Sequence, residues 1–199
     1  WTEIREKTDL VKLAEVGQKG VDLLLSDSTN AEVPGTTPTE RKIISRLEVI
    51  ISQAPGRVII TSFASNVYRL KKIMEIAKKY GKKILLLGSS LAKMLRAIQK
   101  VSLWKIDGTL FVRPAWEKKV APQKLIIFCT GSQGEAKAVL SRLAHQIHPD
   151  WKIMRGDTII LTSSPIMDNR YNLEAINNKL TELGATVYEN SKEELLHAS

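Results

Sequence analysis

Apolar residues fall into short, dense runs along most of the chain, and longer amphipathic stretches separate these runs. Runs of three to five mostly apolar or β-branched residues occur at 57–61, 83–87, 125–129, 158–162 and 186–188. Glycine or small polar residues follow the first four runs. Near-continuous apolar runs with such boundaries are typical of strands that are covered on both faces. The pattern therefore predicts five buried strands.

Between these runs the apolar residues recur with helical spacing. This spacing predicts helices from Thr39 to Pro55 and over 66–80, 91–101, 136–145 and 171–183. Residues 102–120 are irregular, with one short strand expected at 109–112. Repeated alternation of strand, loop and helix indicates βαβ crossovers. We therefore predict an α/β domain with three layers, Rossmann-like, around a mostly parallel sheet.

The N-terminal part has a different rhythm. A helix is expected over 8–17, and a short buried strand over 21–25 leads into the polar run Ser-Asp-Ser-Thr-Asn at 26–30. Side chains that follow the carboxyl end of a strand often carry chemistry, so Asp27 is a candidate functional acid. The alternative is that Asp27 or Ser28 caps a turn. Pro34, Gly35 and Pro38 then predict a loop and a domain junction.

Composition limits the class of protein. Hydrophobic residues make up 43% of the 199 positions and charged residues 26%, which is ordinary for a globular protein. The single cysteine, Cys129, lies in an apolar run and reads as a buried hydrophobe. One cysteine allows no disulfide within the chain, which favours a reducing, cytoplasmic setting. No apolar run is long enough to span a membrane, and no signal-peptide pattern is present.

The net charge of +9 points to a polyanionic partner such as RNA, although a solvated basic face would give the same count. In a parallel sheet the loops at 62–66, 88–90, 130–135 and 163–165 must share one edge. Such loops bring backbone N–H groups at helix N-termini towards phosphate oxygens. With the nearby cations Arg69, Lys71 and Arg142, they predict an anion-binding crevice. Taken singly, Ser65 and Ser89 could be helix caps, and Gly131 and Gly134 turn glycines.

Several familiar catalytic patterns are missing from the sequence. No loop has the glycine spacing of a dinucleotide or nucleoside-triphosphate site, and no Gly-x-Ser-x-Gly run occurs. The three histidines form no His-x-His-x-Asp-His or His-Glu-x-x-His run, and one cysteine cannot supply a zinc set. We therefore expect no metal ligands in this chain and no cofactor bound by it.

Six short motifs follow one another in a fixed order along the chain. They are Leu-Ser-Asp-Ser-Thr-Asn-Ala-Glu at 25–32, Thr-Ser-Phe-Ala-Ser-Asn-Val at 61–67, Thr-Gly-Ser-Gln-Gly-Glu at 130–135, Gly-Asp-Thr at 156–158, Ser-Ser-Pro-Ile at 163–166 and His-Ala-Ser at 197–199. Together they make the chain similar to the ribonuclease J family of metallo-β-lactamase/β-CASP nucleases. The resemblance runs from about Thr8 to the last residue.

This resemblance implies a division of the chain. Residues 1–33 would be the last piece of a metallo-β-lactamase domain, and residues 34–199 the β-CASP domain inserted into it. The family's two zinc ions belong to the metallo-β-lactamase domain, and its zinc-binding motif would lie upstream of Trp1. The intact enzyme would be a zinc-dependent 5′-exo- and endoribonuclease of RNA processing and decay. The present chain alone is expected to be inactive.

The resemblance also assigns roles to residues. Asp27 matches an acid that supports a catalytic histidine, whereas His197 and Ser199 match positions that hold an RNA phosphate. The family commonly has histidine at Tyr68 and arginine at Ser89, so this chain departs from the pattern there. The predicted RNA- and phosphate-binding residues are Ser65, Asn66, Arg69, Gly131, Ser132, Ser163, Ser164, His197 and Ser199.

The expected partners are single-stranded RNA and the metallo-β-lactamase domain. The intact protein is also expected to be able to form a homo-oligomer. No membrane partner is expected. Two other functions stay open at this point: a free-standing α/β domain that binds a phosphosugar or nucleotide, and a non-catalytic interaction module.

Overall fold

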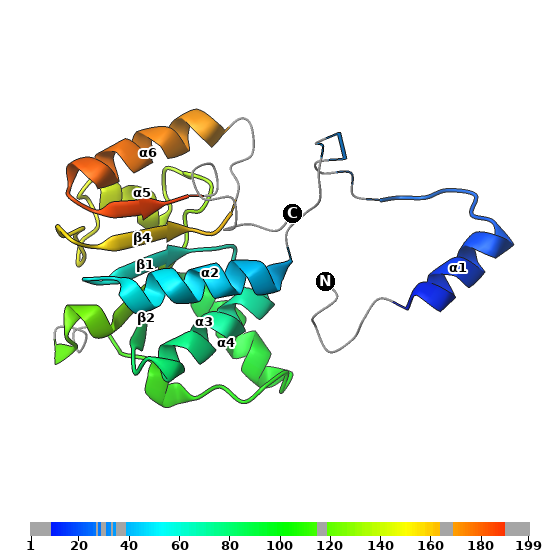
Figure 1. Cartoon of the computed structure of the whole chain (residues 1–199), viewed down its shortest axis with the longest axis horizontal. Coiled ribbons are helices and arrows are strands. Elements are labelled where there is room, and N and C mark those ends of the chain that lie inside the picture. Colours follow the sequence, from blue (N-terminus) through cyan, green and yellow to red (C-terminus); the bar gives the residue numbers. More distant parts are fainter. Residues whose placement is uncertain are drawn as a thin grey trace.

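Five parallel strands form the centre of the protein. The computed structural model describes residues 9–26, 28, 31–32, 34, 39–114, 119–163 and 169–189. The strands stand in the order β2-β3-β1-β4-β5, and every neighbouring pair is parallel (Figure 1). The predicted α/β fold with its parallel sheet is confirmed. The strands are β1 (Val58–Thr61), β2 (Lys83–Leu87), β3 (Leu125–Cys129), β4 (Thr158–Leu161) and β5 (Thr186–Tyr188).

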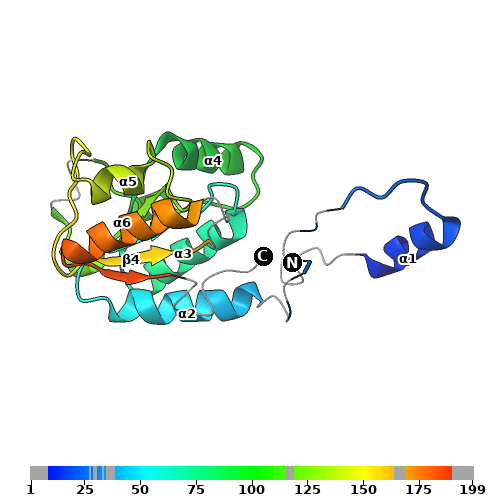
Figure 2. The same ribbon diagram turned by 90° about the horizontal axis from the view of Figure 1, so that it is seen from above.

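Helices cover both faces of this sheet and complete the three layers (Figure 2). Three of them pack on one face: α2 (Glu40–Gln53), α3 (Val67–Lys79) and α4 (Ser89–Lys100). The opposite face is covered by α5 (Val139–Ala144) and α6 (Arg170–Glu182). Successive strand side chains point to opposite faces. Val58 and Ile60 accordingly belong to the first core, and Ile59 to the second.

The segment that precedes the α/β domain differs from its prediction. Helix α1 (Leu10–Lys19) begins at Asp9, whose carboxylate accepts a hydrogen bond from the Lys12 N–H at 2.9 Å, but none of its residues is buried. Residues 21–26 form no strand, and Leu24 and Leu25 are 78% and 86% exposed. The predicted buried strand is therefore wrong here, because a strand needs a neighbour for its backbone hydrogen bonds and this segment does not join the sheet. Asp27 lies outside the described residues.

The irregular segment between α4 and β3 also differs. Instead of a strand at 109–112, the chain forms a 3₁₀ turn at Gly108–Leu110, and a single bridge joins Phe111 to Ile84 of β2. The Asp107 carboxylate accepts hydrogen bonds from the Thr109 N–H at 3.0 Å and from its hydroxyl at 2.6 Å. This side chain caps the turn and so prevents an extended conformation. A second 3₁₀ turn, Pro122–Lys124, leads into β3.

A buried ion pair ties the amino ends of two central strands together. The Arg57 Nη2 lies 2.5 Å from the Asp157 Oδ2, and Arg57 Nε donates to Oδ1 at 2.9 Å. Arg57 also donates to the Lys152 carbonyl, and the Met154 N–H donates to Asp157 at 2.8 Å. Both charged side chains are almost completely buried. Their hydrogen bonds offset the loss of hydration.

Substitution Asp157→Ala should therefore destabilise the fold by about 3 to 5 kcal/mol, because it leaves the buried Arg57 guanidinium without its counter-ion. Urea unfolding followed by circular dichroism measures this change. The matched control is Glu75→Ala, which removes the exposed pair between Lys72 and Glu75 and should change stability by less than about 1 kcal/mol. Equal losses in the two variants would contradict the structural role of the buried pair.

Candidate functional site

The carboxyl ends of the parallel strands lie at one edge of the sheet, and the connecting loops meet there (Figure 1). A Cβ atom placed on Gly88 would lie 3.3 Å from the Thr130 side chain, so the loops after β2 and β3 touch. The Ser163 hydroxyl donates to the Ser132 carbonyl at 3.3 Å, and the Thr162 hydroxyl donates to the Thr61 carbonyl at 2.7 Å. The prediction that these loops are neighbours is confirmed for their described residues.

The centre of this edge is also a topological switch point. From β1 the chain continues into α3 on one face of the sheet, whereas the adjacent strands β3 and β4 continue into α5 and α6 on the other face. The loops after β1 and its two neighbours consequently diverge. In open parallel sheets ligands bind in the crevice that such divergence creates.

The loop after β1 is buried where it leaves the strand and exposed further along. Ser62 is buried, whereas Ser65 is exposed. The Asn66 side chain caps α3 by accepting the Arg69 N–H at 3.1 Å. The N-cap of α3 is therefore Asn66 and not Ser65, which the sequence had left open as a helix cap. The Ser65 hydroxyl is left at the surface beside the start of a 13-residue helix, where the helix dipole favours an anion.

The loop after β3 is shaped by two glycines with positive φ, Gly131 at +116° and Gly134 at +72°. Between them, Ser132 and Gln133 are buried at 2% and 4% exposure. The Gln133 N–H donates to the carboxylate of Glu135 at 3.2 Å. This loop thus already directs a backbone N–H towards an anionic oxygen, which is the geometry that phosphate binding uses.

Arg69 has a structural task at this edge. Its side chain is 2% exposed, its Nη2 lies 2.5 Å from the Glu40 Oε1, and its Nη1 donates to the Thr162 carbonyl. It therefore fastens α3 to α2 and to the end of β4. Of the other two cations predicted nearby, Lys71 lies 5.5 Å from the centroid of the Trp104 ring. Burial and, second to it, the positive charge of Arg142 lower the pKa of His148.

One buried hydroxyl has no partner among the described residues. It is the Oγ1 of Thr61, the last residue of the central strand β1, and Thr61 is 0% exposed. Buried polar atoms are usually hydrogen-bonded, so an unpaired one at a strand's carboxyl end is notable. Thr61, Thr162 and Gln133 were not among the predicted site residues. Thr61 and Thr162 stand at the ends of the apolar runs 57–61 and 158–162, and Thr61 and Gln133 lie within the motifs at 61–67 and 130–135, which were the signals that the sequence offered.

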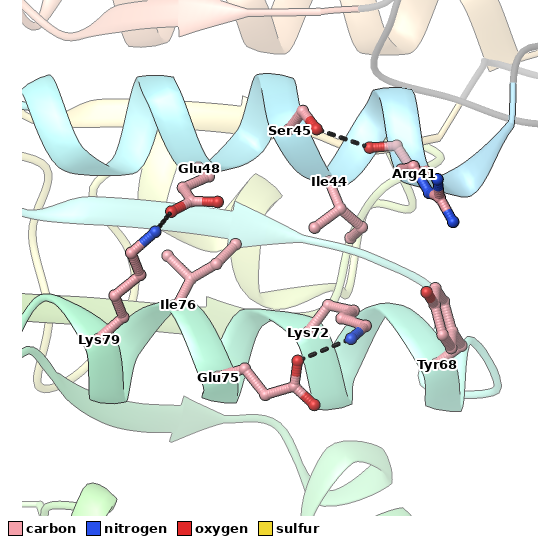
Figure 3. A pocket seen from close by; sticks show the side chains of 9 residues that line it. All are labelled: Arg41, Ile44, Ser45, Glu48, Tyr68, Lys72, Glu75, Ile76 and Lys79. Carbon is pink, nitrogen blue, oxygen red and sulfur yellow. Dashed lines mark hydrogen bonds and ion pairs between the residues drawn. The ribbon is translucent and has the colours of Figure 1, made fainter. Parts of the chain in front are cut away.

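A separate groove of about 470 Å³ lies between α2 and α3. Figure 3 shows Tyr68 and Arg41 at one end of this groove, and the Glu48–Lys79 pair at the other. Lys79 and Glu48 are 2.6 Å apart, and Lys72 and Glu75 are 2.7 Å apart. The hydrogen bond from Lys79, followed by that from Tyr80, lowers the pKa of Glu48. Paired charges of this kind offer little attraction to a polyanion.

The described residues contain no cluster of three or more His, Cys, Asp or Glu side chains that could hold a metal ion. Within the same residues, no helix has the length and apolar character to cross a membrane. Cys129 is buried, and burial raises the pKa of its thiol to about 12, which suits a core residue rather than a nucleophile. Ser164, His197 and Ser199 lie outside the described residues.

Together the sheet and its helices define a class: three-layer α/β domains with a parallel sheet and a topological switch point. The family described as "Ribonuclease J, beta-CASP domain" matches residues 55–180. The chain therefore belongs to the ribonuclease J β-CASP family, and the resemblance seen in the sequence is confirmed.

Curated relatives named "Ribonuclease J" support this assignment. That of Synechocystis sp. is 40% identical over 179 residues, which cover 90% of this chain and 28% of the relative. The Mycoplasma genitalium protein is 39% identical over 194 residues, 98% of this chain and 34% of the relative. The Thermus thermophilus protein is 40% identical over 178 residues, 89% of this chain and 31% of the relative. The chain thus spans about a third of the length of these relatives.

Substitution Gly131→Ala tests how the loop after β3 is built. The new Cβ would lie 2.9 Å from the Leu140 Cβ and 3.0 Å from the Ala138 Cβ, at a φ that alanine rarely adopts. We expect a loss of stability of about 1 to 3 kcal/mol, measured by urea unfolding. Gly108→Ala is the control, because no atom lies within 4 Å of its added Cβ. A Gly131→Ala variant as stable as the control would show that the loop is not tightly packed.

Proposed function

We propose that this chain is the RNA-binding β-CASP part of a ribonuclease and that the loop edge of its sheet holds phosphate groups of single-stranded RNA. The observation that carries the proposal is the meeting of the loops after β1, β2, β3 and β4 at one switch point, in a chain of this family. The net charge of +9 supports an anionic partner.

The chemistry of the edge suits a phosphate better than a base or an apolar ligand. Ser65 offers an exposed hydroxyl at the start of α3, and the positive φ of Gly131 turns the loop that leaves β3 at the same edge of the sheet. The hydroxyl of Thr61, at the end of β1, has no hydrogen-bond partner among the described residues. Hydroxyls and backbone N–H groups at helix N-termini are general ligands for phosphate oxygens.

Within this proposal the predicted residues divide into two groups. Ser65, Ser132, Ser163 and Gly131 would line the phosphate site directly. Asn66 and Arg69 would act through the structure, because Asn66 caps α3 and Arg69 is held by Glu40 and the Thr162 carbonyl. For Ser164, His197 and Ser199 the phosphate-binding role rests on the family resemblance alone.

We further propose that residues 1–33 belong to a metallo-β-lactamase domain and residues 34–199 to the β-CASP domain. Helix α1 supports this division. Its apolar residues Leu10 and Leu13 are 69% and 63% exposed, as expected for a helix whose packing partner is another part of the nuclease. Asp27 would then support a catalytic histidine at the boundary between the two domains.

In the intact enzyme two zinc ions would activate water and stabilise the charge on the scissile phosphate. The described residues supply no ligand cluster for such ions. This chain's contribution is instead to bind and orient the RNA for 5′-exo- or endonucleolytic cleavage. The intact protein would be able to form a homo-oligomer. We expect the isolated 199 residues not to cleave RNA with added zinc, and zinc-dependent cleavage in a gel assay would contradict this.

The sharpest test of RNA binding is Ser65→Ala. Loss of a hydrogen bond to a charged phosphate should weaken binding of a 5′-phosphorylated RNA 4-mer about tenfold, measured by fluorescence anisotropy, without a change in unfolding free energy. Ser52→Ala, an exposed serine on α2 near the other edge of the sheet, should bind like the wild type. The proposal fails if the unmodified chain does not bind RNA. It also fails if the affinity for RNA does not depend on the salt concentration. Tight binding of nucleotides or phosphosugars in its place would favour a small-ligand domain.

A further inference from the structure

Positive charge is segregated along one part of the chain. Between Glu75 and Asp107 the sequence contains eight Lys or Arg residues and no Asp or Glu. Four of the eight are engaged in the structure. Lys78 and Lys79 pair with Asp107 and Glu48, and Lys82 and Lys83 donate to the carbonyls of Gln123 and Thr109.

The other four cations have no acidic partner among the described residues. Three of them, Lys93, Arg96 and Lys100, lie on α4, and Lys105 follows shortly after it; all four are exposed. We call Lys93, Arg96 and Lys100 the α4 stripe. Their spacing of three and four residues places them on one face of the helix. Leu91, Leu95 and Ile98 face the core instead, so the stripe is directed to solvent.

The stripe begins close to the candidate phosphate site. Gly88, which precedes α4, touches Thr130 at the loop edge of the sheet, and Lys93 lies about one turn into the helix. At 1.5 Å per residue, the stripe extends for about 10 Å away from that edge. Successive cations are thus about 4.5 and 6 Å apart along the axis. A polyanion leaving the edge along α4 would meet one positive charge after another.

We propose that the α4 stripe is a second RNA-binding surface, which holds the backbone of a single strand that continues beyond the phosphate site. This inference rests on the proposed function. The stripe differs from the groove between α2 and α3, where Lys72 and Lys79 are neutralised by glutamates. Its contacts would be electrostatic and independent of sequence, and they would add affinity only for strands long enough to reach α4.

The test uses the full 199-residue chain and two 5′-phosphorylated oligonucleotides, a 4-mer and a 20-mer. In the triple variant Lys93→Gln/Arg96→Gln/Lys100→Gln we expect about tenfold weaker binding of the 20-mer and an unchanged affinity for the 4-mer. The slope of log K against log salt should fall by about two for the 20-mer. The control Lys152→Gln/Arg155→Gln/Lys179→Gln removes the same charge from the amino edge of the sheet and should retain wild-type affinity.

Each remaining outcome is decisive. If the triple variant binds the 20-mer like the wild type, while Ser65→Ala weakens both oligonucleotides, the stripe is not an RNA surface and the proposed function stands. If the wild type binds neither oligonucleotide, the proposed function fails and the stripe proposal with it. An equal loss in the control variant would assign the effect to net charge.

Poly-glutamate tests whether the stripe binds acidic protein instead. That would be the result if poly-glutamate bound the wild type as tightly as the 20-mer does and did not bind the triple variant. Circular dichroism melts confirm that both variants are folded.

Discussion

All five strands of the sheet run in the same direction, and most of the arrangement of the protein follows from this constraint. Parallel strands cannot be joined by tight turns, so each connection must cross a face of the sheet. The helices therefore cover both faces, and every loop that leaves a strand's carboxyl end emerges at the same edge. The candidate site is consequently assembled by the topology, which brings several loops to one edge.

Two buried arginines stabilise opposite edges of this sheet. At the amino edge, the ion pair of Arg57 and Asp157 joins β1 and β4. Arg57 also donates to the Lys152 carbonyl, and Asp157 accepts from the Met154 N–H, so the chain before β4 is held as well. At the carboxyl edge, Arg69 links α3 to Glu40 of α2 and to the Thr162 carbonyl. Burying a guanidinium is unfavourable unless its partners are well placed. These two contacts therefore specify how β1 and the helices beside it are positioned, while small hydroxyl and glycine residues make up the loops at the carboxyl edge.

The sequence predicted the α/β core well because each strand is a dense apolar run and each helix has its own apolar stripe. The bounds of β2, β3 and β5 agree to the residue. Prediction failed where local pattern was overruled. The leucines at 23–25 have the pattern of a strand, but no strand of the sheet lies beside them to pair with. At 109–112 the Asp107 side chain caps a 3₁₀ turn where the pattern predicted a strand. At the site, Ser65 and Gly131 were identifiable from their loops. The occupation of Arg69 by Glu40 was not, because it joins residues 29 positions apart.

We propose that the loop edge of the parallel sheet binds RNA phosphates. Titration of the isotopically labelled chain with a 5′-phosphorylated RNA 4-mer, followed by amide chemical shifts, tests it most directly. We expect the largest shifts at residues 62–66, 88–90 and 130–135, with little change around Arg57 and Trp151 at the opposite edge. Shifts concentrated at that opposite edge, or in the groove between α2 and α3, would contradict it.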